Sequence, residues 1–142
     1  MISYTITRRI EFDAGHRIYG HESKCANIHG HRYVALITCC PADHLDELGR
    51  VIDFSVIKER IGGWIDMNLD HGMILFKGDP LCELFSERLE DHKFFVMDTN
   101  PTAENIAELI YRVAKNTLPQ SIKMCGVKLY ETPNCYAVYS ER

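Results

Sequence analysis

The chain has 142 residues, of which 46% are hydrophobic and 25% charged, a composition typical of an ordinary globular domain. Its 16 Lys and Arg residues against 20 Asp and Glu give a formal net charge of −4. This balance argues against a basic surface for nucleic acid or for an anionic membrane. The length predicts one domain covering residues 1–142. Seven His and six Cys residues direct attention to a metal site.

The N-terminal residues lack the apolar stretch and small-residue cleavage site of a secretory signal. No apolar run approaches the length of a membrane span. We therefore expect a cytoplasmic protein without a membrane or nucleic-acid partner. In a reducing compartment its cysteines should be free thiols or metal ligands.

Two strands are predicted in the first third of the chain. Residues 2–13 alternate apolar and polar side chains, which is the period of a half-buried strand. Residues 31–40 are rich in β-branched and apolar side chains, and Pro41 ends this second strand. From Asp53 onward, apolar residues recur at three- and four-residue steps, which predicts a helix that either Asp53 or Ser55 can cap.

An inserted segment, residues 73–99, follows this helix. It contains a predicted short helix over 79–89 and an extended piece over 93–97. A longer helix begins at the capping residue Thr102.

Two further strands are predicted over 122–131 and 135–140. Strands that bracket helices in this order predict an α+β fold. We expect an antiparallel four-stranded sheet with two main helices on one face, plus the inserted short helix.

Three histidines form the strongest chemical signal. His29 and His31 are two residues apart at the start of a strand, so their side chains share one face, and antiparallel pairing brings His16 close. Three neutral imidazoles are a suitable ligand set for catalytic zinc with an open fourth position. Cys25 is either a fourth ligand, which would close the site, or an activated thiolate. We expect three other cysteines to pack as small buried hydrophobes: Cys82, Cys125 and Cys135.

Three acidic positions are candidates for substrate chemistry. Asp70 and His71 form an acid/base dyad if a turn brings the adjacent side chains together; otherwise they are a solvated helix exit. Glu104 in the first turn of a helix serves the helix dipole or a ligand. Glu131, at a strand end, faces solvent or accepts two parallel N–H donors of an amino-pyrimidinone.

These residues occur in an order that is specific as a set. The motifs are Phe12-Asp-Ala-Gly-His16-Arg, Cys25-x3-His29-Gly-His31, Val51-Ile-Asp53-Phe54, Leu69-Asp70-His71, Pro101-Thr102-Ala-Glu104-Asn105 and Glu131-Thr132, and the match that they mark runs from about residue 4 to residue 139. Together they resemble the 6-pyruvoyl-tetrahydropterin synthase and 6-carboxy-tetrahydropterin synthase family. The resemblance implies a tunnelling fold (T-fold) and homotrimers or homohexamers with active sites between subunits.

The resemblance also implies roles for single residues. The expected zinc ligands are His16, His29 and His31. The expected catalytic residues are Cys25, Asp70 and His71. Glu131 corresponds to the anchor of the pterin ring, with Thr102 and Glu104 as supporting contacts. The expected substrate is 7,8-dihydroneopterin triphosphate. Basic residues must hold its phosphates, and Arg17 and Lys24 are candidates because they lie near the other site residues in the sequence.

The spacing between Cys25 and His29 distinguishes two branches of that family. Three intervening residues resemble the branch that forms 6-carboxy-5,6,7,8-tetrahydropterin, acetaldehyde and triphosphate on the way to 7-deazaguanine and queuosine. The alternatives are a 6-pyruvoyl-tetrahydropterin synthase and a non-catalytic zinc-binding paralogue. The 73–99 segment is longer than in the shortest members of the family.

Overall fold

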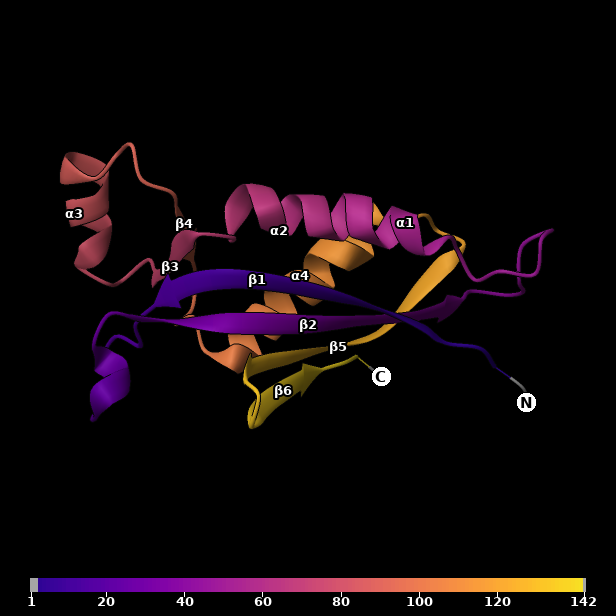
Figure 1. Cartoon of the computed structure of the whole chain (residues 1–142), viewed down its shortest axis with the longest axis horizontal. Helices are drawn as coiled ribbons and strands as arrows, with labels where there is room; N and C mark the ends of the chain where they lie inside the picture. The colour runs from indigo at the N-terminus through magenta and orange to yellow at the C-terminus, as the bar shows by residue number, and fades with distance from the viewer. Residues whose placement is uncertain (1–2, 142) are drawn as a thin grey trace.

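The computed structural model describes residues 3–141, so Ile2, the expected start of the first strand, lies outside the described residues. The structure is built on a curled sheet with the strand order β4-β3-β1-β2-β5-β6 (Figure 1). Its four antiparallel strands are β1 (Ile6–His16), β2 (His29–Pro41), β5 (Ile122–Thr132) and β6 (Cys135–Tyr139). A short 3-10 turn, η1 (Lys24–Ala26), lies in the loop between β1 and β2.

The pairing of β1 with β2 determines which side chains face the core. The register runs without a break from Ile6 opposite Cys39 to His16 opposite His29. Phe12 lies opposite Tyr33, and the two rings stack with centroids 5.0 Å apart. Because side chains alternate between the faces of a sheet, the even positions of β1 and the odd positions of β2 form one apolar face.

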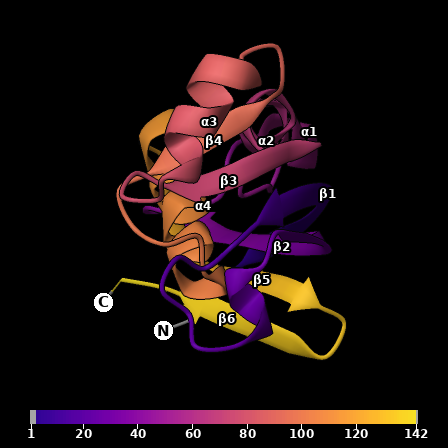
Figure 2. The same cartoon turned by 90° about the vertical axis from the view of Figure 1, so that its left-hand side faces the viewer.

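The predicted four-stranded antiparallel sheet is wrong. The inserted segment adds β3 (Gly72–Phe76) and β4 (Phe94–Met97), and the sheet has six strands of mixed direction. β3 runs parallel to the end of β1, and β4 runs parallel to β3. The reason is physical: a helix, α3 (Leu81–Arg88), carries the chain back between the two strands, and such a crossover produces parallel neighbours. Figure 2 shows α3 beside β3 and β4 at one end of the molecule.

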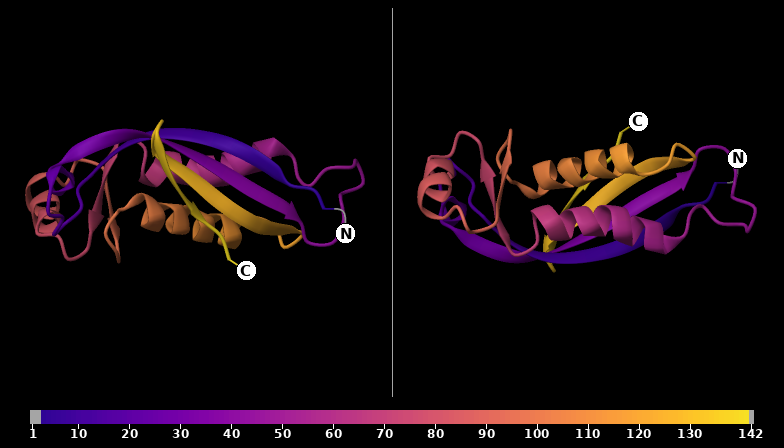
Figure 3. Two further views of the ribbon diagram at one scale, coloured as in Figure 1. Left: turned by 90° about the horizontal axis from the view of Figure 1, so that it is seen from below. Right: turned by 90° about the horizontal axis from the view of Figure 1, so that it is seen from above.

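The two main helical segments cover the same face of the sheet (Figure 3). The first is continuous through α1 (Phe54–Ile57), a π-helical turn η2 (Lys58–Gly62) and α2 (Gly63–Asn68). The second is α4 (Ala103–Thr117). Both begin as the sequence predicts, because the Asp53 side chain accepts a hydrogen bond from the Ser55 amide and Thr102 accepts one from the Asn105 amide.

The core lies between this helical layer and the sheet. Its largest fully buried side chains come from both layers: Phe12, Tyr33, Ile37, Ile57, Ile61, Ile65, Leu69, Ile74, Leu75, Ile106, Ile110 and Leu129. This core fixes the ends of β1 and β2, where the candidate ligands lie.

No helix within residues 3–141 combines the length and the apolar character needed to cross a bilayer.

An ion pair attaches the inserted segment to the end of β1. Arg17 Nε donates to Asp79 Oδ2 at 2.7 Å, and its Nη2 donates to Oδ1 of the same carboxylate. The Asp79 side chain is fully buried and also accepts a hydrogen bond from the Leu81 amide at the start of α3. Burial by itself raises the pKa of Asp79, but the bonds from Arg17 and Leu81 lower it overall. Asp79 is thus held charged in a buried place.

Replacing Arg17 with Met should lower the free energy of unfolding by about 2–4 kcal/mol, because a buried carboxylate loses its partner. Urea denaturation followed by circular dichroism measures the change. The matched control is Lys77→Met, which removes an exposed pair with Asp98 in the same segment and should cost less than about 1 kcal/mol. Equal effects of the two substitutions would contradict this account of Asp79.

Candidate active site

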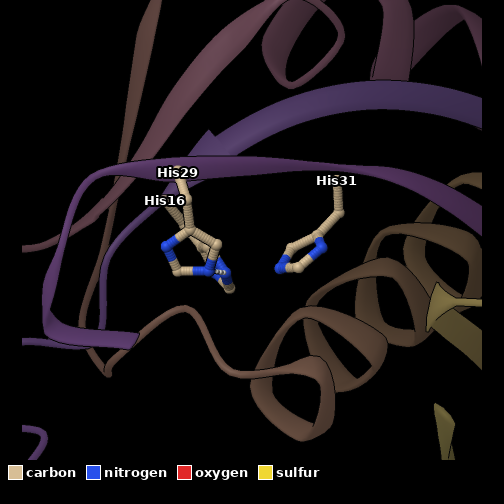
Figure 4. A group of neighbouring side chains, drawn as sticks. All are labelled: His16, His29 and His31. Carbon is tan, nitrogen blue, oxygen red and sulfur yellow. Dashed lines mark hydrogen bonds between the residues drawn. The ribbon is translucent and has the colours of Figure 1, made fainter. Parts of the chain in front are cut away.

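The three predicted histidines lie together at the paired ends of β1 and β2. His16 and His29 are directly opposite one another in the register, and their Nε2 atoms are 3.1 Å apart. One nitrogen from each of His16, His29 and His31 lies within 4.8 Å of the other two. Figure 4 shows the three rings pointing into a common space from the two strands.

Two backbone carbonyls define the tautomers of this cluster. His16 Nδ1 lies 2.7 Å from the Pro101 carbonyl oxygen, and His29 Nδ1 lies 2.7 Å from that of Asn27. A carbonyl oxygen only accepts, so in the neutral rings both Nδ1 atoms carry the proton and both Nε2 atoms carry lone pairs. Two lone pairs facing each other at 3.1 Å repel unless a cation lies between them.

The ligand set fits a metal ion on a further observation. His31 Nε2 is buried and has no hydrogen-bond partner within residues 3–141. Zinc bonds to imidazole of about 2.0–2.1 Å in a tetrahedral site place ligand nitrogens about 3.3 Å apart. The separation of the His16 and His29 nitrogens is close to that value.

The electrostatics favour the neutral form of His16 and of His31 near pH 7. Burial, helped by the nearby His29 and His31, lowers the pKa of His16 to about 4 against the raising effect of the Pro101 hydrogen bond. Burial also lowers the pKa of His31, in opposition to the carboxylate of Glu131. Since a metal binds only the neutral ring, His16 and His31 can bind a cation near pH 7 without first losing a proton.

Glu131 brings a carboxylate to the same cluster. Its two oxygens lie 3.9 Å from His16 Nε2 and 3.7 Å from His31 Nε2. A cavity of about 530 Å³ opens beside it. Five of the predicted site residues line this cavity: His16, Cys25, Thr102, Glu104 and Glu131.

Cys25 lies on η1, in the loop that joins β1 to β2. Its carbonyl accepts a hydrogen bond from the Ile18 amide at 2.8 Å, and Asn100 exchanges two hydrogen bonds with the backbone of Tyr19 in the same loop. The Cys25 sulfur does not belong to the described group of ligand atoms that lie within 4.8 Å of one another. Cys25 therefore lines the cavity beside the histidines without joining their cluster.

Asp70 and His71 do form a pair, but in a different cavity. The turn after α2 places His71 Nδ1 3.0 Å from Asp70 Oδ2, while Asp70 Oδ1 accepts a hydrogen bond from the Asp13 amide. Their cavity, of about 550 Å³, is lined by His71 together with Asp13, His31, His92 and Lys93, among others. A single chain therefore does not bring the dyad into the cavity that Cys25 lines.

Several residues of the site were not expected from the sequence. Tyr33 is fully buried, and its hydroxyl oxygen lies 3.2 Å from His16 Nδ1. The sequence signal that could have identified Tyr33 is its place two residues after His31, which puts both side chains on the same face of the strand. Cys135 and Tyr136 of β6 line the cavity with Cys25. The expectation of buried hydrophobes was wrong for Cys135, which is exposed on the edge strand, and Cys82 and Cys125 are only partly buried.

The metal-free protein should lose stability as the pH falls from about 6.5 to about 4. Unfolded His16 binds a proton below pH 6.5, whereas the folded ring stays neutral down to about pH 4. Protons therefore favour the unfolded state across this window, and His16 alone accounts for a loss of about 3 kcal/mol. Urea titrations with a chelator at pH 7.5, 5.5 and 4.5 measure the loss.

The substitution His16→Gln should flatten this part of the profile, and His44→Gln, at an exposed position, should leave it unchanged. A His16→Gln protein with the full pH dependence would contradict the assignment.

Comparisons with known proteins agree over nearly the whole chain. A model of the family described as 6-pyruvoyl tetrahydropterin synthase matches residues 5–142. The 6-carboxy-5,6,7,8-tetrahydropterin synthase of Rickettsia bellii is 48% identical over 135 residues, which cover 92% of this chain and 95% of that protein. The protein of the same name from Aquifex aeolicus is 31% identical over 99% of both chains.

Solved structures agree with the fold. An uncharacterised protein from Wolinella succinogenes superposes with a TM-score of 0.86 at 23% identity, covering 100% of both chains. The 6-pyruvoyl tetrahydropterin synthase of Caenorhabditis elegans superposes with a TM-score of 0.70 at 24% identity, covering 100% of this chain and 98% of that one. The chain therefore has the T-fold, and it belongs to the 6-pyruvoyl tetrahydropterin synthase family as an enzyme of the lyase class.

Proposed function

We propose that the chain, acting as one domain, converts 7,8-dihydroneopterin triphosphate and water to 6-carboxy-5,6,7,8-tetrahydropterin, acetaldehyde and triphosphate. The observation that carries the proposal is the cavity in which His16, Cys25 and Glu131 meet beside the three-histidine cluster. The names of the Rickettsia and Aquifex relatives support the carboxy product. This reaction would serve the synthesis of 7-deazaguanine and queuosine.

The proposed cofactor is zinc, held by the Nε2 atoms of His16, His29 and His31. A bound zinc ion acts as a Lewis acid on the oxygens of the substrate side chain and acidifies the neighbouring C–H bonds. The carbonyls of Pro101 and Asn27 fix two of these rings in the tautomer that presents Nε2. Burial keeps His16 neutral, and its ring therefore stays available near pH 7.

Glu131 is proposed to anchor the pterin. A carboxylate accepts two parallel N–H donors, and the amino-pyrimidinone edge of a pterin offers such a pair. Thr102 and Glu104 at the start of α4 line the same cavity and would add contacts to the ring.

Proton transfer is proposed for Cys25 and for the Asp70–His71 dyad. Cys25 as a thiolate would move a proton on one face of the substrate side chain. Asp70 orients the His71 ring through Nδ1, which leaves Nε2 to move a proton on the other face. Arg17 is less suited to bind the triphosphate than the sequence implied, because Asp79 already holds its guanidinium.

The separation of the two cavities supports an oligomer. Because His71 and Cys25 line different cavities of one chain, a complete set of proton-transfer groups requires a second copy. We therefore propose a homotrimer or homohexamer in which one subunit supplies the histidines and Cys25 while its neighbour supplies the dyad. β6, an edge strand of the sheet, borders the Cys25 cavity and offers unpaired backbone groups for such an assembly.

Purified zinc-loaded protein incubated with 7,8-dihydroneopterin triphosphate should yield 6-carboxy-5,6,7,8-tetrahydropterin, acetaldehyde and triphosphate, as read by mass spectrometry. A pyruvoyl side chain in the product would contradict the proposal and favour a 6-pyruvoyl-tetrahydropterin synthase. No turnover at all, with zinc bound, would favour a non-catalytic paralogue.

The substitution Cys25→Ala should lower kcat by at least about 100-fold while the zinc content stays at the wild-type level, because the thiol moves protons and is not a ligand. Cys135→Ala is the matched control, since Cys135 lines the same cavity, and it should retain most of the activity. Loss of zinc from Cys25→Ala would instead indicate a closed four-ligand site.

A further inference from the structure

The turn that carries Asp70 and His71 is held in an unusual conformation. The backbone φ of His71 is +59°, the one positive value of a non-glycine residue within residues 3–141. This left-handed region costs an L-residue about 1–2 kcal/mol, although His tolerates it better than most. The His71 side chain is 76% exposed, so packing of the ring does not compensate for this cost. Other contacts must hold the turn.

Backbone hydrogen bonds hold the amide groups of the turn. The Asp70 amide donates to the Ile65 carbonyl at 2.9 Å, and the His71 amide donates to the Asp13 carbonyl at 2.6 Å. The Gly72 amide donates to the Leu69 carbonyl at 3.0 Å. These bonds satisfy the donors of the turn, but the carbonyls at the end of α2 still need partners.

Lys93 supplies a partner to two of these carbonyls at once. Its Nζ lies within hydrogen-bond distance of the carbonyl oxygens of Asp66, in the last turn of α2, and of Asp70 itself. An ammonium group at this place also interacts favourably with the negative end of the helix dipole. Lys93 therefore connects the helix end to the dyad residue that follows it.

The fold brings Lys93 to this turn through the inserted segment. Lys93 directly precedes β4, and its own carbonyl accepts a hydrogen bond from the Met73 amide at 3.1 Å. A Cβ atom placed on Gly72 would lie 3.1 Å from Lys93 Cγ, so the lysine stem crosses the turn directly over this glycine. The absence of a side chain at Gly72 lets the stem lie this close.

The charges around Asp70 agree with this arrangement. Burial raises the pKa of Asp70, but the Asp13 amide, the His71 ring and the charge of Lys93 together lower it. Asp70 is therefore ionised near pH 7 and able to accept the His71 Nδ1 proton.

We propose that Lys93 is a positioning residue that clamps the Asp66 and Asp70 carbonyls and so holds the turn in the conformation that presents the Asp70–His71 pair. The inserted segment thus has a structural role, because Lys93, which directly precedes β4, stabilises this turn. The effect on turnover rests on the proposed function, in which His71 moves a proton. The effect on the structure of the turn does not depend on that function.

The test compares three substitutions by backbone amide hydrogen exchange. Lys93→Met should speed exchange of the Asp70, His71 and Gly72 amides at least 10-fold, while the Ile106 and Ile110 amides of the α4 core change less than 3-fold. Lys93→Gln, whose amide can reach one carbonyl, should give a smaller increase and guards against a Met variant that does not fold. Lys77→Met, an exposed lysine of the same segment, should leave all of these amides unchanged.

Turnover gives the second readout. Lys93→Met should lower kcat by at least 10-fold with KM changed less than 3-fold, and Lys93→Arg should recover part of the loss. Unchanged exchange in the turn, or an equal increase in the turn and in the α4 core, would overturn the clamp whatever the activity. Full activity of His71→Gln would instead overturn the proposed role of the dyad. In that case amide hydrogen exchange alone would test whether Lys93 holds the turn.

Discussion

The register of β1 against β2 is the constraint on which the rest of the structure depends. It places His16 opposite His29 and leaves His31 two residues along the same face, so that three imidazoles meet at one end of the hydrophobic core. A slip of one residue would move His29 and His31 to the opposite face, away from His16. The stacked pair of Phe12 and Tyr33 lies in the same register and holds it from the core side.

The fold was largely predictable wherever the signal was local. Alternation in β1, β-branched and apolar residues in β2, and caps at the starts of the two main helices mark elements that the structure confirms. The parallel strands β3 and β4 were not predicted as part of the sheet. Each is a short apolar run, and such runs do not distinguish a strand from a buried loop by periodicity. Their pairing with β1 depends on a crossover through α3, which no local pattern encodes.

The candidate site likewise has a part that local sequence signals predict and a part that they do not. The meeting of His16, His29 and His31 follows from strand pairing and a period of two, so the sequence was enough to predict it. The contacts that prepare these rings were not predictable, because they come from backbone carbonyls such as that of Pro101, 85 residues away from His16. The contacts of Lys93 were not predictable for the same reason. Its ammonium group binds two backbone carbonyls, and only the fold of the inserted segment brings it to them.

Side chains and backbone thus have separate tasks at this site. His16, Cys25 and Glu131 line one cavity, while the backbone carbonyls of Pro101 and Asn27 orient the rings of His16 and His29. His71, on its clamped turn, lines a second cavity. Under the proposed function, the chemistry therefore requires that subunits assemble.

X-ray absorption at the zinc K-edge of the zinc-loaded protein tests the central claim, a three-histidine metal centre beside a free thiol, most directly. The account predicts a first shell of nitrogen and oxygen scatterers at about 2.0–2.1 Å and no sulfur. A sulfur scatterer at about 2.3 Å would show that Cys25 is a ligand and would contradict the account.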